Sequence, residues 1–452
     1  MIRADMATLI KTLRLRDIYS LMVGAVIGSG VFLVPGTILR QVGGSVGLAL
    51  LVWIAGGVLS LLGALTYGEL AAMNPVSGGL YVYIRDAFGA LPAFLYGWGL
   101  FLVIAPGTNA TLAVAFSTYL REIVPLSPFG GKLVSVGMIS VITIVNVLGT
   151  RKSADLQNYT TWLKIGGIAL MSAVLLALGH GYKASFQALW PAHFDSGIAA
   201  GFGLAMIAVM WAYEGWQWCS YSAGEMIAPQ RDFPRASLSG VLTLIAIYLL
   251  PVCAYFAALG PVRAAASDTI AAASVSVIVG PWAAKLVAVM ILVSVFSAAN
   301  STFLTVPRVF YAMARDGLFF RKLAEVHPRF HTPAVAIVAT GILSSVLASI
   351  GTFEQLFTYV VLVAWIFYGL AGATLFVFRR RGSAPTLPYR VPGYPWTPLL
   401  FVLASAAVVI NAIGSDWKDS SRCVAILLLG LPAYLFWRKR AGAMPDPDAR
   451  RT

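Results

Sequence analysis

A charge-free run near the start of the chain, residues 18–39, is long enough to cross a bilayer, because a membrane-spanning helix needs about 20 apolar residues. Its centre, Gly28-Ser29-Gly30, is nevertheless a poor helix, since each glycine costs about 1 kcal/mol relative to alanine. A break at membrane depth exposes backbone N–H and C=O groups, so it is tolerated only where it faces protein or a water-filled cavity. A ligand can pair with those groups. The run therefore predicts a substrate site at mid-membrane, which is typical of a transporter.

Composition independently indicates a membrane protein. Hydrophobic residues make up 59% of the chain and charged residues 11%, compared with about 25% charged residues in soluble domains. The apolar run that follows the basic segment 1–17 is too long for the core of a cleavable signal peptide. Cys219, Cys253 and Cys423 have no metal or redox spacing, so we expect no metal, no cofactor and no structural disulfide.

The apolar runs predict twelve transmembrane helices in an all-α integral membrane protein. Their expected ranges are 18–40, 46–70, 88–120, 133–150, 157–178, 200–227, 237–259, 283–314, 334–352, 355–378, 397–414 and 421–437. Most of the 32 Lys and Arg residues fall in alternate connections, which places both termini in the cytoplasm. The net charge of +14 thus follows the topology, and nucleic acid is not expected as a partner.

A second interrupted span lies in residues 200–227, where AYEGWQWCSYSAGE places Glu214 and then Gly215 deep in an apolar segment. The first and sixth spans begin two successive five-helix blocks, and interrupted helices at matching positions indicate an inverted-repeat transporter with its site at both breaks. The expected organisation is a tail (1–17), a ten-helix core (18–378) with repeats 18–178 and 200–378, two further helices (397–437) and a tail (438–452).

At these residues the chain resembles the amino acid–polyamine–organocation (APC) superfamily, and within it the L-amino-acid transporter branch. The matching stretches are GAVIGSGVFLVPG (24–36), PVSGGLYVYIRDAFG (75–89), WAYEGWQWCSYSAGEMIAPQRDFPRA (211–236) and NSTFLTVPRVFYAMARDGLF (300–319). The resemblance implies a LeuT-like five-plus-five inverted repeat with helices 1 and 6 broken. It also implies alternating access and α-amino-acid substrates.

The first break suits an amino acid carboxylate. Ser29, Gly30 and Val31 lead into a half-helix whose free N–H groups and positive dipole end attract an anion. Backbone carbonyls beside the breaks are expected to hold the ammonium group. The candidate carbonyls are those near Val26 or Ile27 and those of Trp211 and Ala212.

The resemblance also implies that the substrate side chain lies between helices one, three, six, eight and ten. The residues that could line this pocket are Asn109, Tyr213, Trp216, Ser297 and Asn300. We expect Trp216→Ala to change the rank order of substrates. For the polar members the alternative is hydrogen bonding between helices, worth about 1 kcal/mol.

Three ionisable residues fall within apolar segments. Lys164 is either a functional charge at membrane depth or a side chain that snorkels to a surface about 12 Å away. The resemblance favours function, because sodium-independent members carry a lysine here in place of a sodium ion. Glu214 is either a proton-titrating or cation-selecting carboxylate or a solvated group in a vestibule. Glu225 is interpreted as a gate or structural residue.

Together these features predict a permease that moves L-amino acids across the plasma membrane by alternating access, independently of sodium, as an exchanger or proton symporter. The alternative is a polyamine or cationic amino acid transporter that uses Glu214. An enzyme is disfavoured because all four histidines fall in expected loops, and a channel because it needs no paired broken helices. The resemblance also implies that animal members carry, in the loop 121–132, a cysteine that links a partner glycoprotein. This chain has no cysteine there, so we expect a stand-alone bacterial inner-membrane protein.

Overall fold

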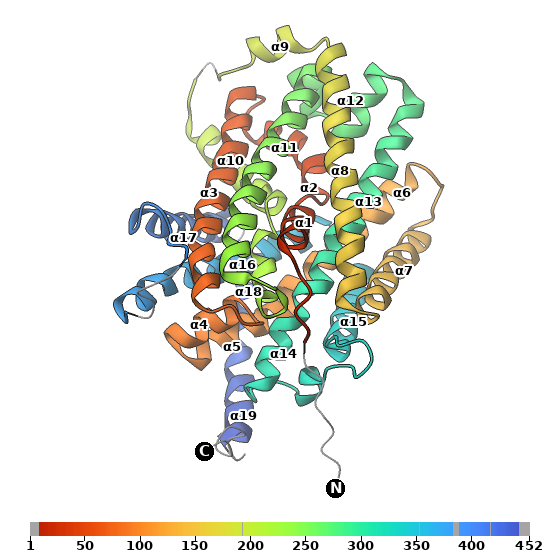
Figure 1. Cartoon of the computed structure of the whole chain (residues 1–452). Helices are drawn as coiled ribbons and strands as arrows, with labels where there is room; N and C mark the ends of the chain where they lie inside the picture. The colour runs from red at the N-terminus through yellow and green to blue at the C-terminus, as the bar shows by residue number, and fades with distance from the viewer. Residues whose placement is uncertain (1–8, 192, 352, 383–387, 416, 443–452) are drawn as a thin grey trace.

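The computed structural model describes residues 9–442 except 192, 352, 383–387 and 416, and within this part of the chain every extended regular element is a helix (Figure 1). Nine of the described helical segments are long and apolar enough to cross a membrane. They are α3 (Val46–Met73), Ala90–Arg121, α7 (Pro128–Val147), α8 (Thr150–Leu178), α11 (Pro229–Ala265), Pro281–Arg315, α16 (Phe353–Arg380), α17 (Trp396–Ser415) and Trp417–Arg440.

The three remaining apolar segments are shorter or bent. α1 (Leu15–Val26) and α2 (Gly30–Gln41) form one pair bent by 42°, while α10 (Ser196–Ala212) and α15 (Ala334–Ile350) are single shorter helices. In chain order these segments and the nine long ones correspond to the twelve helices expected from the sequence. The all-helical fold class is therefore confirmed.

Several spans are composite. Ala90–Arg121 joins α5 (Ala90–Gly99) and α6 (Ala105–Arg121) through a π-helical turn at Leu100–Ile104. α13 (Pro281–Thr305) continues as α14 (Pro307–Arg315), and α18 (Trp417–Leu428) as α19 (Gly430–Gly442). The short helices α4 (Leu80–Phe88), α9 (Tyr182–Gln187) and α12 (Ile270–Ile278) lie in the connections.

The sixth predicted span, 200–227, is interrupted beside Glu214 and Gly215 as expected, but its second half is not an α-helix. α10 ends at Ala212, and the chain continues through Gly215 into 3₁₀ turns at Trp216–Tyr221 and Ala223–Glu225. Gly215 has φ of 120°, a conformation that L side chains rarely adopt, so an α-helix cannot pass through it. Two other boundaries were placed seven or eight residues too late, because α8 starts at Thr150 and α11 at Pro229.

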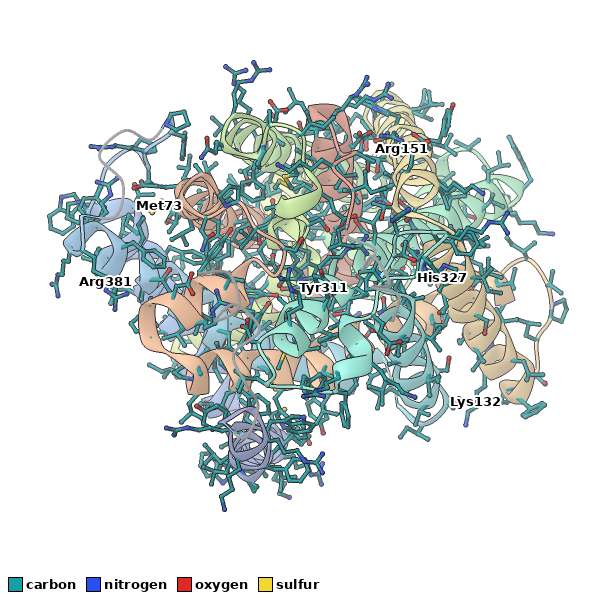
Figure 2. All side chains as sticks on the ribbon, turned by 60° about the horizontal axis from the view of Figure 1, so that its bottom comes forward. Met73, Lys132, Arg151, Tyr311, His327 and Arg381 are labelled. Atoms are coloured by element: carbon teal, nitrogen blue, oxygen red, sulfur yellow. The ribbon has the colours of Figure 1, made fainter. Side chains whose placement is uncertain are left out.

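α1 lies in the interior of the molecule, in contact with α8, α11 and α13, whereas α2 packs on α10 and α11 (Figure 1). The break between α1 and α2 is thus enclosed by protein, as the principle of backbone satisfaction requires. The described ends of the chain extend to the same end of the bundle, where basic residues such as Arg151 and Arg381 gather (Figure 2).

A buried ion pair closes this end of the bundle. Arg308 on α14 donates from Nε and Nη2 to the two carboxylate oxygens of Glu225, at 2.6 and 3.1 Å, and both side chains are 1% exposed. Thr150 at the start of α8 bonds to both partners. The Glu225 carbonyl also accepts from the N–H groups of Thr12 and Leu13. Glu225 therefore ties α14, α8 and the N-terminal segment together.

We expect Arg308→Met to lower the free energy of unfolding by about 3–5 kcal/mol, because it leaves the buried Glu225 carboxylate without its cation. Titration of the purified protein with a denaturing detergent measures the change. Arg315→Met, which removes an exposed charge from the same helix, should change stability by less than about 0.5 kcal/mol. Equal losses in the two variants would contradict the assignment.

Candidate functional site

The first break leaves a cluster of free backbone donors. Phe32 and Leu33 both donate to the Ser29 carbonyl at 3.1 Å, so α2 begins directly after this residue. Among the described residues, the N–H groups of Ser29, Gly30 and Val31 have no backbone acceptor, as expected for the first turn of a helix. The Ser29 hydroxyl is buried and also has no partner in this part of the chain. The break thus offers several donors at one point.

The two breaks touch each other. A Cβ atom added at Gly30 would lie 2.6 Å from the Cα atom of Ala212 at the end of α10. Likewise, a Cβ atom added at Gly215 would lie 3.2 Å from the Cβ atom of Ala25. Tyr248 on α11 joins the breaks, because its hydroxyl oxygen lies 2.6 Å from the Val26 carbonyl oxygen and 2.8 Å from that of Ala212, and its one proton is shared between these two acceptors. Glycine at position 30 is therefore a packing requirement as well as a break.

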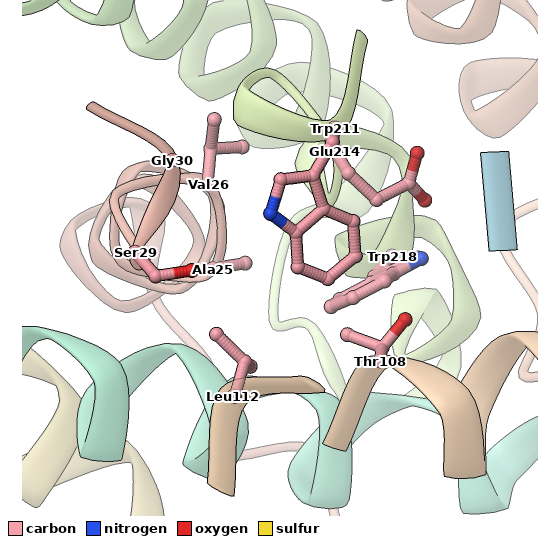
Figure 3. Close-up of a pocket in the computed structure, with 10 residues that line it drawn as sticks. Ala25, Val26, Ser29, Gly30, Thr108, Leu112, Trp211, Glu214 and Trp218 are labelled. Carbon is pink, nitrogen blue, oxygen red and sulfur yellow. The ribbon is translucent and has the colours of Figure 1, made fainter. Parts of the chain in front are cut away.

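A small cavity lies between the breaks and α6 (Figure 3). The rings of Trp211 and Trp218 face Thr108 and Leu112 across it in Figure 3. Its lining residues are Ala25, Val26, Gly28, Ser29, Gly30, Thr108, Leu112, Trp211, Glu214 and Trp218. Apolar and aromatic walls with a few polar groups are typical of a small-molecule site.

Glu214 is the carboxylate of this cavity. Its Oε1 accepts a hydrogen bond from Gln217 Nε2 at 2.8 Å and another from the Tyr368 hydroxyl. Gln217 and Tyr368 also contact each other, so the three side chains form one buried network. Within the described chain both of these hydrogen bonds reach Oε1, and Glu214 is 6% exposed. The network fixes the position of the carboxylate beside the second break.

Lys164 lies at the first break and does not snorkel. Its Nζ donates to the carbonyls of Gly24 and Ile27, both at 2.7 Å, and to that of Ser294 at 3.3 Å. The side chain is fully buried. Because α8 starts at Thr150, seven residues earlier than expected, Lys164 is about four turns inside the helix and too deep to reach the surface. It therefore connects α8 to α1 and α13.

The sequence-predicted residues separate into two groups. Five of the predicted residues line the cavity: Val26, Ser29, Gly30, Trp211 and Glu214. The others lie next to it or in the surrounding packing: Ile27, Val31, Asn109, Lys164, Ala212, Tyr213, Gly215, Trp216, Ser297 and Asn300. Their functional roles stay predictions.

The predicted residues that do not line the cavity have other contacts in the structure. The Trp216 ring packs on Tyr67 and Phe401, and Tyr213 on Trp53 and Tyr248. Ser297 bonds to the Thr160 hydroxyl at 2.9 Å. Asn300 belongs to a network in which it bonds to Asn146 and Gln157. These polar contacts are of the interhelical kind.

Sequence reasoning missed Ala25, Gly28, Thr108, Leu112 and Trp218, and two local geometries account for the largest errors. The π turn at Leu100–Ile104 changes the register of α6, so Thr108 faces the cavity in place of its neighbour Asn109. In the 3₁₀ turn at Trp216–Tyr221 residues three apart share a face, which brings Trp218 under Gly215. No signal in the sequence alone distinguishes these geometries from an α-helix.

We expect Trp218→Ala to change the rank order of substrates, because it removes a wall of the cavity. Trp216→Ala, which the sequence alone predicts to change the rank order of substrates, is the matched control. The Trp216 ring packs on Tyr67 and Phe401 outside the cavity lining, so with the structure we expect this variant to lower all rates together. Competition of a panel of amino acids against one labelled substrate measures both. If Trp218→Ala lowered all rates equally and Trp216→Ala changed the selectivity, Trp216 and not Trp218 would be the residue that lines the substrate site.

Comparison with known proteins gives consistent matches over nearly the whole chain. A family model described as amino acid permease matches residues 13–431. The chain is 31% identical to a serine/threonine exchanger of Bacillus subtilis over 93% of this chain and 95% of the relative. It is 31% identical to a mouse b(0,+)-type amino acid transporter, covering 92% and 86% of the two chains. It is 30% identical to the mouse large neutral amino acids transporter small subunit 2, covering 94% and 81%.

Proposed function

This chain belongs to the amino acid permease family of the APC superfamily, and from that premise we propose that it exchanges L-amino acids with small side chains, independently of sodium, by alternating access. It is a multi-pass membrane transporter of amino acids. The family match and the relatives do not favour a polyamine as substrate.

The observation that carries the proposal is the set of free donors at the first break. Three consecutive N–H groups and the unpartnered Ser29 hydroxyl meet at the start of α2, where the helix dipole is positive. A carboxylate accepts two or more such hydrogen bonds and completes the first turn of the helix. Charge-assisted bonds of this kind are about twice as strong as neutral ones.

The ammonium group of the substrate is assigned to the Ala212 carbonyl. The Ile27 carbonyl already accepts from Lys164 and Ser294, which occupies both of its lone pairs. The Ala212 carbonyl accepts from Tyr248, and in the described chain no other hydrogen bond to it is found, so one lone pair remains. Ala212 also touches Gly30, which keeps the two charges of an α-amino acid close together.

The cavity walls support a small side chain. Leu112, Trp211 and Trp218 line a narrow cavity, whose space the groups that bind the substrate backbone must share with the substrate side chain. Thr108, whose hydroxyl is buried without a partner in the described chain, can bond to a substrate hydroxyl or amide. Such a bond favours polar over purely aliphatic substrates of the same size, because an unpaired buried hydroxyl is costly.

The proposal also covers the arrangement in the membrane. We assign both termini to the cytoplasm of a bacterial plasma membrane, since the basic residues gather at their end of the bundle. The core 18–378 consists of the two repeats 18–178 and 200–378, followed by the two further helices. The chain works without a partner subunit, as the absence of a cysteine in 121–132 suggests.

Counterflow in proteoliposomes tests the transport proposal. Vesicles that contain the protein are loaded with one amino acid, and uptake of labelled serine is followed in choline and in sodium medium. We expect saturable uptake that depends on internal amino acid and is equal in the two media. Non-saturable uptake would indicate a channel, and preferential exchange of putrescine would restore the polyamine alternative.

A further inference from the structure

A second, larger cavity lies at the end of the bundle where the described chain ends gather. Three separate segments form its walls: the N-terminal segment, the junction of α7 and α8, and the loop before α15. Its lining residues are Ile10, Thr12, Leu148, Gly149, Thr150, Arg151, Lys152, Arg329, Phe330 and His331. It shares no residue with the cavity at the breaks, so substrate binding does not explain it.

The walls of this second cavity carry positive charge and, among the lining residues, no carboxylate. Arg151 is partly neutralised by Asp17, at 2.9 Å, and by Asp155. Lys152 and Arg329 form no ion pair with any carboxylate in the described part of the chain, and both are exposed. Two unneutralised cations therefore face one volume, next to the start of α8.

Two buried polar atoms in the same walls lack hydrogen-bond partners. These are the Thr12 hydroxyl and His331 Nδ1, for which the described chain supplies no partner. Buried polar atoms are nearly always paired with protein, water or a ligand, so these two are available to bond to the oxygen atoms of a ligand in this cavity. His331 also has a φ of 53°, a strained conformation for a residue other than glycine, and its N–H bonds to the His327 carbonyl at 2.9 Å.

The start of α8 adds to this arrangement. Gly149, with φ of 137°, turns the chain into the helix, and the first N–H groups of the 29-residue α8 follow it. A helix start carries about half a positive charge and favours anions. Fixed cations, unpaired buried polar atoms and free N–H groups together match a phosphate group, which has several acceptor oxygens and a negative charge.

We propose that this second cavity binds a phosphate group, and that an anionic phospholipid head group is its main source. The same cavity has an apolar wall of Ile10, Leu148 and Phe330, and Ile10 and Leu148 are 47% and 39% exposed. Basic pockets at the membrane surface beside apolar residues are typical of lipid head-group sites. The ligand joins the N-terminal segment, which is bonded to Glu225, to α8 and the loop before α15.

Because the ligand joins three segments of the folded state, binding should raise the unfolding temperature. The full-length protein is titrated in a neutral detergent with phosphatidylglycerol, with phosphatidylcholine and, at constant ionic strength, with inorganic phosphate. We expect phosphatidylglycerol to raise the unfolding temperature far more than phosphatidylcholine. A rise with inorganic phosphate alone would identify soluble phosphate as the source and still support the phosphate site.

The variant Lys152→Ala/Arg329→Ala removes the two unpaired cations from exposed positions, so it should fold normally. Its apparent affinity for phosphatidylglycerol should fall about tenfold or more, because each basic residue near the ligand contributes separately. Arg321→Ala/Lys322→Ala is the matched control, since it removes two exposed cations outside the lining. Equal responses of the two variants, equal responses to the two lipids, or no response to any probe would overturn the proposal.

Discussion

Lys164→Ala is expected to reduce amino acid exchange about a hundredfold or more, although the protein still folds and inserts. Lys164 Nζ pairs the carbonyls of Gly24, Ile27 and Ser294, and the first two belong to the end of α1. Without Nζ the Gly24 carbonyl has no donor in the described chain, and the Ile27 carbonyl keeps only Ser294. A buried acceptor left without a partner costs about 1–3 kcal/mol, and 1.4 kcal/mol corresponds to a tenfold change in rate. The end of α1, and with it the donor cluster at the break, would lose its fixed position.

Counterflow in proteoliposomes measures this loss, and two further variants separate its causes. Lys164→Met keeps most of the volume but not the donors, so it should be as impaired as the alanine variant. Lys183→Ala removes an exposed lysine on α9 and should transport normally. Near-normal exchange by Lys164→Met would show that the volume of the Lys164 side chain, and not its hydrogen bonds, holds the end of α1 in position.

The position of Lys164 also predicts that transport does not depend on sodium. A fixed ammonium at carbonyl oxygens repels a second cation by several kcal/mol at the effective dielectric of a protein interior, about 20. We therefore expect the same rate in choline and sodium media for the unmodified protein. A requirement for sodium would contradict this reading of Lys164.

The broken first helix, the interrupted sixth segment and the helical class follow from the sequence because they rest on strong local signals. Glycine pairs within charge-free runs cost helix stability wherever they occur, and long apolar runs have few alternatives to a spanning helix. The position of Gly30 at the break needed only this reasoning, whereas the placement of Lys164 beside the break was implied by the resemblance to the APC superfamily and not by its position in the sequence. Helix starts were harder, since Pro229 and Thr150 begin their helices inside polar segments that lack periodic apolar residues.

The side chains that line the cavity could be predicted only in part. Ser29 and Trp211 follow from the breaks themselves, but Thr108 and Trp218 depend on a π turn and a 3₁₀ turn. These turns are decided by tertiary packing rather than by residue propensity, so their registers cannot be read from a single sequence. The network of Glu214, Gln217 and Tyr368 is likewise hard to predict. Glu214 and Gln217 are three positions apart, but Tyr368 is 151 or more positions away from both.

Gly30→Leu should abolish substrate binding while the protein inserts normally. Even the Cβ of alanine would lie 2.6 Å from the Cα and 2.7 Å from the Cβ of Ala212, and backbone cannot yield as a flexible side chain does. The two breaks must then separate, which moves the free N–H groups away from the Ala212 carbonyl. We expect uptake by the Gly30→Leu protein to fall by about a hundredfold or more, since overpacking a tight contact costs about 1–3 kcal/mol and the binding groups are also displaced.

Gly166→Leu is the matched control for this substitution. Gly166 is an exposed glycine of α8, and a Cβ there meets no atom within 4 Å, so leucine at this position should leave uptake unchanged. The variants are compared for monodispersity in detergent, for the shift of unfolding temperature with added serine, and for uptake. A folded Gly30→Leu protein without a serine-dependent shift agrees with carboxylate binding at the break. Wild-type affinity in that variant would mean that the substrate carboxylate binds elsewhere. The observed backbone cannot hold a leucine side chain at position 30 and also keep the contact between the two breaks.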